Sequence, residues 1–138
     1  MGATKLSDEE LIEKAKQAYA QAYAPYSNYS VGAVLLTRAG TVLLGCNVED
    51  ATMNLGVCAE RAAIINGVIT DGPTMKIDTI AVTAKTPGPC APCGNCRQLF
   101  SEFADPQSRL IFDNGDGFRP YQLAELLPYT YTLKPQPV

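Results

Sequence analysis

The sequence contains no histidine and no tryptophan, and it has few basic residues. Without histidine, any zinc ion must be bound through sulfur or carboxylate ligands. Eleven Lys and Arg against fourteen Asp and Glu give a net charge of −3, which argues against stable binding to long nucleic acid. We therefore expect a small or neutral ligand.

A long apolar run is also missing, because no stretch approaches the roughly 20 residues that a membrane-spanning helix needs. The first ten residues are polar and acidic, unlike a secretory signal peptide. The five cysteines, an odd number, fit a reduced compartment better than a disulfide framework. These features predict a cytoplasmic protein that does not bind membranes.

A chain of 138 residues with 46% hydrophobic content is long enough for one domain with a core, and we expect that domain to span residues 1–138. Ser7 and Glu10 form a capping box before the first helix, which ends before Pro25. The predicted elements are, in order, helix 8–24, strands 30–37 and 41–48, helix 58–69, strand 77–84, helix 96–103, strand 109–112 and helix 121–127. This order predicts an α/β fold in which helices pack on a mixed sheet.

Three cysteines in two clusters are the most informative feature of the chain. Cys58 stands where one helix begins, and Cys93 and Cys96 stand three residues apart where a later helix begins. Their spacing lets Cys93 and Cys96 share one metal ion, and helix N-termini favour thiolate over thiol. A zinc ion with three protein ligands keeps its fourth coordination position for water or substrate.

Charged residues beside these cysteines predict further chemistry. Glu60 follows the first cysteine by two residues, which suits a base acting on a metal-bound water better than it suits a fourth ligand. Arg61 and Arg97 each come close after a cysteine and could donate hydrogen bonds to the sulfurs. The alternative for both arginines is that they are solvated helix charges.

Two other interpretations of the cysteines stay open at this point. A structural zinc site would use Cys46 or Cys90 as a fourth sulfur. A redox site would use the dithiol formed by Cys93 and Cys96 at a helix start. Neither interpretation explains the glutamate that directly follows Cys58-Ala59.

A glutamate two positions after the first ligand, followed by PCxxC, is typical of zinc nucleobase deaminases, here with Cys58 in place of a histidine. The chain resembles the small, all-cysteine cytidine deaminases. The likeness covers roughly residues 8 to 131. It is carried by the blocks Ala24-Pro25-Tyr26-Ser27, Val31-Gly32-Ala33, Gly45-Cys46-Asn47-Val48-Glu49, Cys58-Ala59-Glu60-Arg61, Pro92-Cys93-Gly94-Asn95-Cys96-Arg97-Gln98 and Glu125-Leu126-Leu127-Pro128.

The resemblance implies a three-layer α/β/α domain around a five-stranded mixed sheet, and a homotetramer whose active sites are shared between subunits. It implies zinc-dependent deamination of cytidine and deoxycytidine to uridine and deoxyuridine, with one Zn²⁺ per subunit. The implied site residues are Cys58, Cys93 and Cys96 as ligands, Glu60 as proton shuttle, the Ala59 amide on the pyrimidine 2-oxo group, Asn47 and Glu49 on the ribose 3′-hydroxyl, and Tyr29 and Tyr131 at the base.

Several positions depart from the family pattern, and all lie where substrate would bind. Tyr29 and Tyr131 fall where phenylalanines are more frequent, Met53 replaces a tyrosine, and Asp50 replaces an asparagine. Because Asp50 would repel a phosphate, we expect nucleosides rather than nucleotides. The alternatives are a deaminase of modified cytosine nucleosides of the blasticidin-S type, which generally lacks the pair at positions 47 and 49, and a non-catalytic zinc module.

Overall fold

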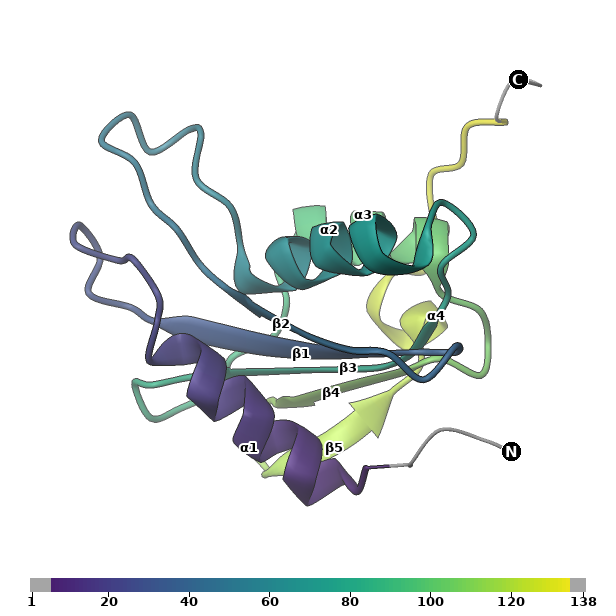
Figure 1. Ribbon diagram of the computed structural model, residues 1–138, viewed down its shortest axis with the longest axis horizontal. Helices are drawn as coiled ribbons and strands as arrows, with labels where there is room; N and C mark the ends of the chain where they lie inside the picture. Colours follow the sequence, from purple (N-terminus) through teal and green to yellow (C-terminus); the bar gives the residue numbers. More distant parts are fainter. Residues whose placement is uncertain (1–5, 135–138) are drawn as a thin grey trace.

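The computed structural model describes residues 6–134, so both ends of the domain predicted over residues 1–138 lie outside the described range. Helices and strands alternate along the chain (Figure 1). The elements are α1 (Asp8–Tyr19), β1 (Val31–Thr37), β2 (Val42–Cys46), α2 (Ala59–Asp71), β3 (Ile77–Ala84), α3 (Gly94–Phe103), β4 (Arg109–Asp113), β5 (Phe118–Tyr121) and α4 (Leu123–Leu126). No helix within residues 6–134 is both long and apolar enough to cross a membrane.

The strands form one five-stranded mixed sheet in the order β2-β1-β3-β4-β5. β1 runs antiparallel to β2 and to β3, as the short hairpin between β1 and β2 requires. β3 and β4 are parallel, because α3 connects them across one face of the sheet, and β5 returns antiparallel to β4. The predicted five-stranded mixed sheet is therefore confirmed.

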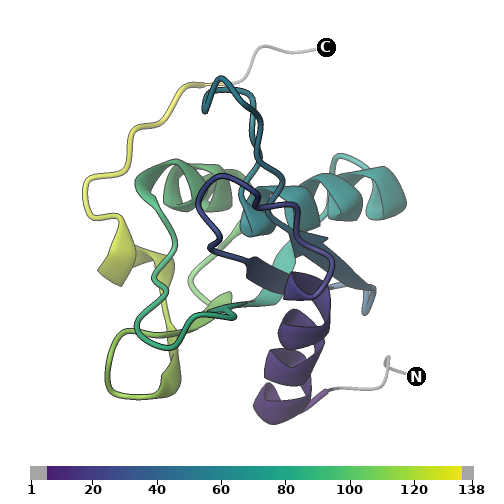
Figure 2. The same cartoon turned by 90° about the vertical axis from the view of Figure 1, so that its left-hand side faces the viewer.

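Helices cover both faces of this sheet and complete three layers (Figure 2). On one face α1 packs Leu11 and Ala15 against Val34 and Leu36 of β1. On the other face α2 packs against β1, burying alternate residues such as Leu35, and α3 contributes Phe100 to the same core cluster. Successive residues of β1 are buried on opposite faces, so this strand reads as a continuous apolar run.

The structure differs from the prediction at the end of the first helix and in the segment after β4. The first helix ends at Tyr19 rather than near residue 24, because the backbone of Tyr23 exchanges hydrogen bonds with Asn47 and Glu49 instead of continuing the helix. The strand β5 was missed, because its exposed residues and Pro120 do not resemble a buried strand, and the helix predicted from residue 121 shortens to α4. Proline is tolerated here because β5 lies at a sheet edge.

Close packing of α2 on β2 fixes where the second helix begins. Gly45 of β2 lies so near this helix that a Cβ atom built on it would be 2.3 Å from the Ala59 carbonyl oxygen and 2.5 Å from the Ala63 nitrogen. Only glycine allows that approach. The start of α2, with the cysteine and glutamate on either side of Ala59, is thus seated directly on the sheet.

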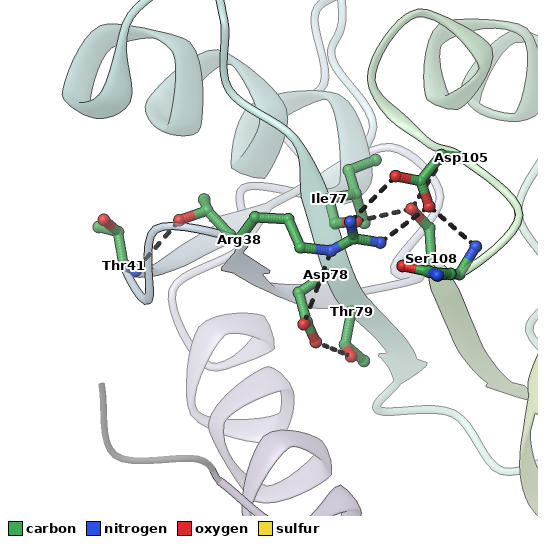
Figure 3. Close-up of polar contacts among 9 residues, drawn as sticks. Arg38, Thr41, Ile77, Asp78, Thr79, Asp105 and Ser108 are labelled. Atoms are coloured by element: carbon green, nitrogen blue, oxygen red, sulfur yellow. Dashed lines mark hydrogen bonds and ion pairs between the residues drawn. The ribbon is translucent and has the colours of Figure 1, made fainter. Parts of the chain in front are cut away.

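An ion-pair network lies at the end of the sheet where β1 ends and where β3 and β4 begin (Figure 3). Arg38 follows β1 and donates to both oxygens of Asp105, at 3.0 and 2.8 Å, while its Nε lies 3.8 Å from Asp78. The Ser108 hydroxyl donates to the Ile77 carbonyl at 2.6 Å. In Figure 1 the loops before β1 and after β2 extend from the opposite end of the sheet. That end, which the ion pairs do not occupy, is available for a binding site.

Candidate active site

Two helix N-termini bring the three predicted cysteines together. Cys58 is the N-cap residue of α2 and Cys93 is the N-cap residue of α3, and neither side chain makes a capping hydrogen bond. Cys96 lies in the first turn of α3 and is buried. The Sγ atoms of the three residues lie within 4.8 Å of one another. The fold thus joins two segments that are about 35 residues apart in the sequence, as the cysteine pattern predicted.

The spacing of the sulfurs fits a zinc ion. The Sγ atom of Cys93 lies 3.9 Å from that of Cys58 and 3.6 Å from that of Cys96. A tetrahedral zinc ion with Zn–S bonds of about 2.3 Å holds its sulfur ligands about 3.8 Å apart. Within residues 6–134, neither Cys46 nor Cys90 belongs to this group. The geometry therefore matches a site with three protein ligands, and it gives no support to a fourth sulfur.

Hydrogen bonding among the sulfurs separates their acidities. The nearby Cys96 thiol lowers the pKa of Cys58 to about 6, with smaller contributions from Cys93 and from Arg61. The neighbouring Cys58 sulfur, together with burial, raises the pKa of Cys96. One sulfur is thus ready as a thiolate near neutral pH, while metal binding has to displace the proton of Cys96.

Glu60 shares a cavity of about 330 Å³ with two of the cysteines. The cavity is lined by Tyr29, Val31, Asn47, Cys58, Ala59, Glu60, Pro89, Cys90, Ala91 and Cys93, and we call it the cysteine cavity. Glu60 is only 5% exposed. Burial raises the pKa of Glu60 to about 7, and the negative charge of Cys58 adds to the rise. A carboxyl group with this pKa can both accept and give a proton near neutral pH.

Three further groups of the cysteine cavity could orient a flat, polar ligand. Ala59 is the first residue of α2, and its N–H has no partner within the helix. Tyr29 is half-buried, and burial raises its pKa to about 12, so the phenol stays neutral. Cys90 is half-buried beside Tyr29, and burial raises the pKa of its thiol. Nothing in the sequence pattern indicated that Cys90 would line the cavity.

Asn47 connects the end of β2 to the loop before β1. Its Oδ1 accepts a hydrogen bond from the Val31 amide at 2.8 Å, and its Nδ2 donates to the Tyr29 carbonyl at 2.9 Å. A side-chain amide has two donor hydrogens and two acceptor lone pairs. Asn47 therefore keeps one donor and one lone pair for a ligand while it holds the wall of the cavity.

Glu49 binds the turn that precedes Tyr29. Its carboxylate accepts hydrogen bonds from the amides of Tyr26 and Ser27, at 3.0 and 3.2 Å, and from the Ser27 hydroxyl. These bonds lower the pKa of Glu49, so it is ionised at neutral pH. Glu49 lines a second cavity of about 240 Å³, which shares Asn47 and Cys58 with the cysteine cavity.

Sequence comparison identifies the family of the chain. The model of the cytidine and deoxycytidylate deaminase zinc-binding region matches residues 5–112. The chain belongs to the cytidine and deoxycytidylate deaminase family. It is 40% identical over 125 residues to the cytidine deaminase of Sporosarcina psychrophila, with 90% of each chain covered. It is 37% identical over 123 residues to the cytidine deaminase of Mycobacterium tuberculosis, with 89% of this chain and 88% of the relative covered.

Solved structures confirm the predicted deaminase fold. The cytidine deaminase of Burkholderia pseudomallei superimposes with a TM-score of 0.81 at 43% identity, over 91% of this chain and all of the other. The enzyme of Mycobacterium tuberculosis gives a TM-score of 0.82 at 34% identity, over 94% of this chain and all of the other. The family match and the spacing of the sulfur atoms both fit one Zn²⁺ at the three cysteines of this deaminase. Neither observation favours a redox site formed by Cys93 and Cys96.

Tyr131 and Arg97 lie differently from what the sequence suggested. Tyr131 is 69% exposed and lines neither cavity of the single chain; its carbonyl accepts a hydrogen bond from Gln98 at 3.0 Å. Arg97 donates to the carbonyls of Pro92 and Leu126, at 2.8 and 3.0 Å. No hydrogen bond from Arg97 to a sulfur is found within residues 6–134. Arg97 therefore holds the backbone next to the cysteines rather than the cysteines themselves.

Asp50 and Met53 both line the second cavity of the deaminase. The Asp50 carboxylate accepts hydrogen bonds from the amides of Thr52 and Leu55, at 3.0 and 2.8 Å, and from the Thr52 hydroxyl. Met53 stands at the tip of this turn with φ of +59° and is 69% exposed. Within residues 6–134, no hydrogen bond joins Asp50 or Met53 to a cysteine sulfur.

Proposed function

We propose that this deaminase converts cytidine and deoxycytidine to uridine and deoxyuridine with release of ammonia. The observation that carries the proposal is the buried carboxyl group of Glu60, which shares one cavity with Cys58 and Cys93 of the three-cysteine group. The relatives described above are named for cytidine, which favours cytidine over modified cytosine nucleosides. A catalytic base at the site disfavours a purely structural zinc module.

The metal and the protein divide the chemistry between them. Cys58, Cys93 and Cys96 would hold a zinc ion, which would supply a water molecule acidic enough to act as a nucleophile near neutral pH. Glu60 takes one proton from this water and places it on N3 of the pyrimidine, which makes C4 electrophilic. As the water oxygen bonds to C4, Glu60 carries the second water proton to the amino group, so that the C4–N bond breaks, ammonia leaves and C4 keeps the keto oxygen.

The remaining cavity residues fit the recognition of the nucleoside. The Ala59 amide is free to donate to the 2-oxo group of the base, and the Tyr29 ring offers a surface for stacking. The unused donor of Asn47, with the ionised Glu49 beside it, fits a sugar hydroxyl. Asp50 adds negative charge to the second cavity, which supports a preference for nucleosides over 5′-phosphorylated substrates.

A single substitution tests the role of Glu60. Glu60→Gln keeps the shape of the side chain but cannot carry a proton, and general acid–base catalysis contributes about 10²–10⁴-fold to rates. We expect kcat for cytidine to fall at least about 10³-fold while zinc content is unchanged. Glu102→Gln, on the exposed side of α3, is the matched control and should keep full activity. Substantial turnover by Glu60→Gln would remove Glu60 from the mechanism.

We also propose a homotetramer with active sites shared between subunits, in the cytoplasm. Large apolar side chains lie exposed on one chain: Ile65 and Ile69 on α2 are 49% and 77% exposed, and Tyr131 and Leu133 near the end of the chain are 69% and 76% exposed. Association would bury them. Light scattering should give four times the 14.8 kDa mass of the chain; a monomer with full activity would contradict shared sites. The five free cysteines suit a reducing compartment.

A further inference from the structure

Ser27 connects Glu49 to Tyr29. Its hydroxyl donates to the Glu49 carboxylate, and the same oxygen accepts a hydrogen bond from the Tyr29 amide at 3.0 Å. A hydroxyl has one donor and two acceptor sites, so both contacts can be made at once. Ser27 itself is exposed and lines neither the cysteine cavity nor the second cavity.

The backbone of Tyr29 is held from both sides. Ser27 binds its amide, and Asn47 binds its carbonyl at 2.9 Å. The preceding residue, Asn28, has φ of +56°, in the left-handed region that is unfavourable for most residues with a side chain. Asparagine adopts this region more readily than other residues with a side chain, which suits it to the turn. The contacts that hold this turn are those of Ser27 and Glu49, together with the Asn28 amide bonded to the Ala24 carbonyl at 3.0 Å.

We propose that Ser27 and Glu49 are positioning residues that hold the Tyr29 ring in the wall of the cysteine cavity. The inference rests on the proposed function, because that cavity is where the cytosine ring binds. It assigns Glu49 a role that does not depend on the sugar. It also assigns a role in substrate binding to Ser27, an exposed serine that does not itself line the cavity.

Two substrates separate this role from sugar recognition. 3′-Deoxycytidine lacks the hydroxyl that Glu49 would bind, so a residue that acts only on that hydroxyl has no effect with this substrate. Ser27→Ala should raise KM about threefold to tenfold for both cytidine and 3′-deoxycytidine, the effect of one or two net hydrogen bonds. kcat should change less than KM, because Ser27 is remote from the reacting atoms.

Further variants test whether the rise in KM depends on the turn that Ser27 and Glu49 hold before Tyr29. Glu49→Gln should raise KM for 3′-deoxycytidine as much as Ser27→Ala does, and the double variant should add little, since both changes break one chain of contacts. Ser27→Thr keeps the hydroxyl and should restore KM. Ser7→Ala removes the N-cap hydroxyl of α1, far from the cavity, and should lower stability without changing KM.

A measurement on the free protein completes the test without any substrate. Ser27→Ala removes the acceptor of the Tyr29 amide, so amide hydrogen exchange at Tyr29 should quicken while exchange at Val31, held by Asn47, changes little. Unchanged exchange at Tyr29, or unchanged KM for both substrates, would overturn the positioning role. Turnover of cytidine by the unmodified protein is the separate test of the proposed function.

Discussion

Replacing Gly45 by alanine tests how the packing of the sheet positions the active site. A Cβ atom at this position would lie 2.3 Å from the Ala59 carbonyl oxygen and 2.5 Å from the Ala63 nitrogen, both in the backbone of α2. Carbon and oxygen atoms that are not bonded to each other normally stay about 3.4 Å apart, so the helix has to withdraw by about 1 Å. Cys58 and Glu60 flank Ala59 and would move with it.

Two consequences of Gly45→Ala can be given magnitudes. Overpacking a core costs about 1–3 kcal/mol, which should appear in the free energy of unfolding measured with urea. A displacement of about 1 Å at an active site costs about 10²-fold, which should appear in kcat/KM for cytidine. Zinc content per chain, measured by metal analysis, should fall as well, because one ligand moves relative to the other two.

Gly94→Ala is the matched control for this prediction. Gly94 lies between Cys93 and Cys96, yet a Cβ atom built on it would meet no atom within 4 Å. Alanine is also the better helix former. We expect stability to stay within about 0.5 kcal/mol and zinc to be retained. If Gly45→Ala kept its stability and its zinc, or if both variants lost zinc equally, then the contact of β2 with α2 would not be what positions the site.

Three further predictions concern the metal site and the surface. Metal analysis should show that Cys93→Ala loses zinc and that Cys90→Ala retains it. Zinc loss from both variants would support a structural site in which Cys90 is a fourth sulfur ligand. Arg61→Gln should move the midpoint of zinc binding to higher pH, because Arg61 lowers the pKa of the Cys58 thiol; an unchanged midpoint in a metal titration would contradict this. Hydrogen bonds from Arg109, at 2.8 and 2.7 Å, lower the pKa of Asp8 below its ordinary 3.8, so this stabilisation is complete above pH 3.8 and is lost as the pH falls through the lower folded value. Asp8→Asn should lower the urea unfolding free energy by about 1 kcal/mol at pH 7 and by less at pH 2; an equal loss at both pH values would contradict the ionic contribution.

Local signals in the sequence were sufficient for most of the fold. The capping box at Ser7 and the apolar runs of β1 and β3 act through neighbouring residues, and the structure has each of these elements where the pattern placed it. Contacts between residues that are far apart in the sequence could not be predicted from these local signals. The first helix stops early because Tyr23 pairs with the chain near residue 48, and β5 exists because β4 offers it a partner.

The metal site was predictable for a different reason. Cysteines at two helix starts, with a glutamate near one of them, indicate a metal site more strongly than any other kind of site. The prediction then required only that the two helix N-termini lie close together in the fold. The contacts of Asn47 and Glu49 were not predictable, because nothing in their neighbours shows that they bind the turn before Tyr29. The only signal was that this turn, through Ser27, belonged to one of the blocks that resemble the deaminases.

The most direct test of the proposed function is the conversion of cytidine by the zinc-loaded protein. Loss of the amino group can be followed by absorbance, with uridine and ammonia quantified at the end of the reaction. We predict one ammonia and one uridine for each cytidine consumed, and no turnover after zinc is removed by a chelator until zinc is restored. A fully zinc-loaded protein that leaves cytidine unchanged would contradict the account.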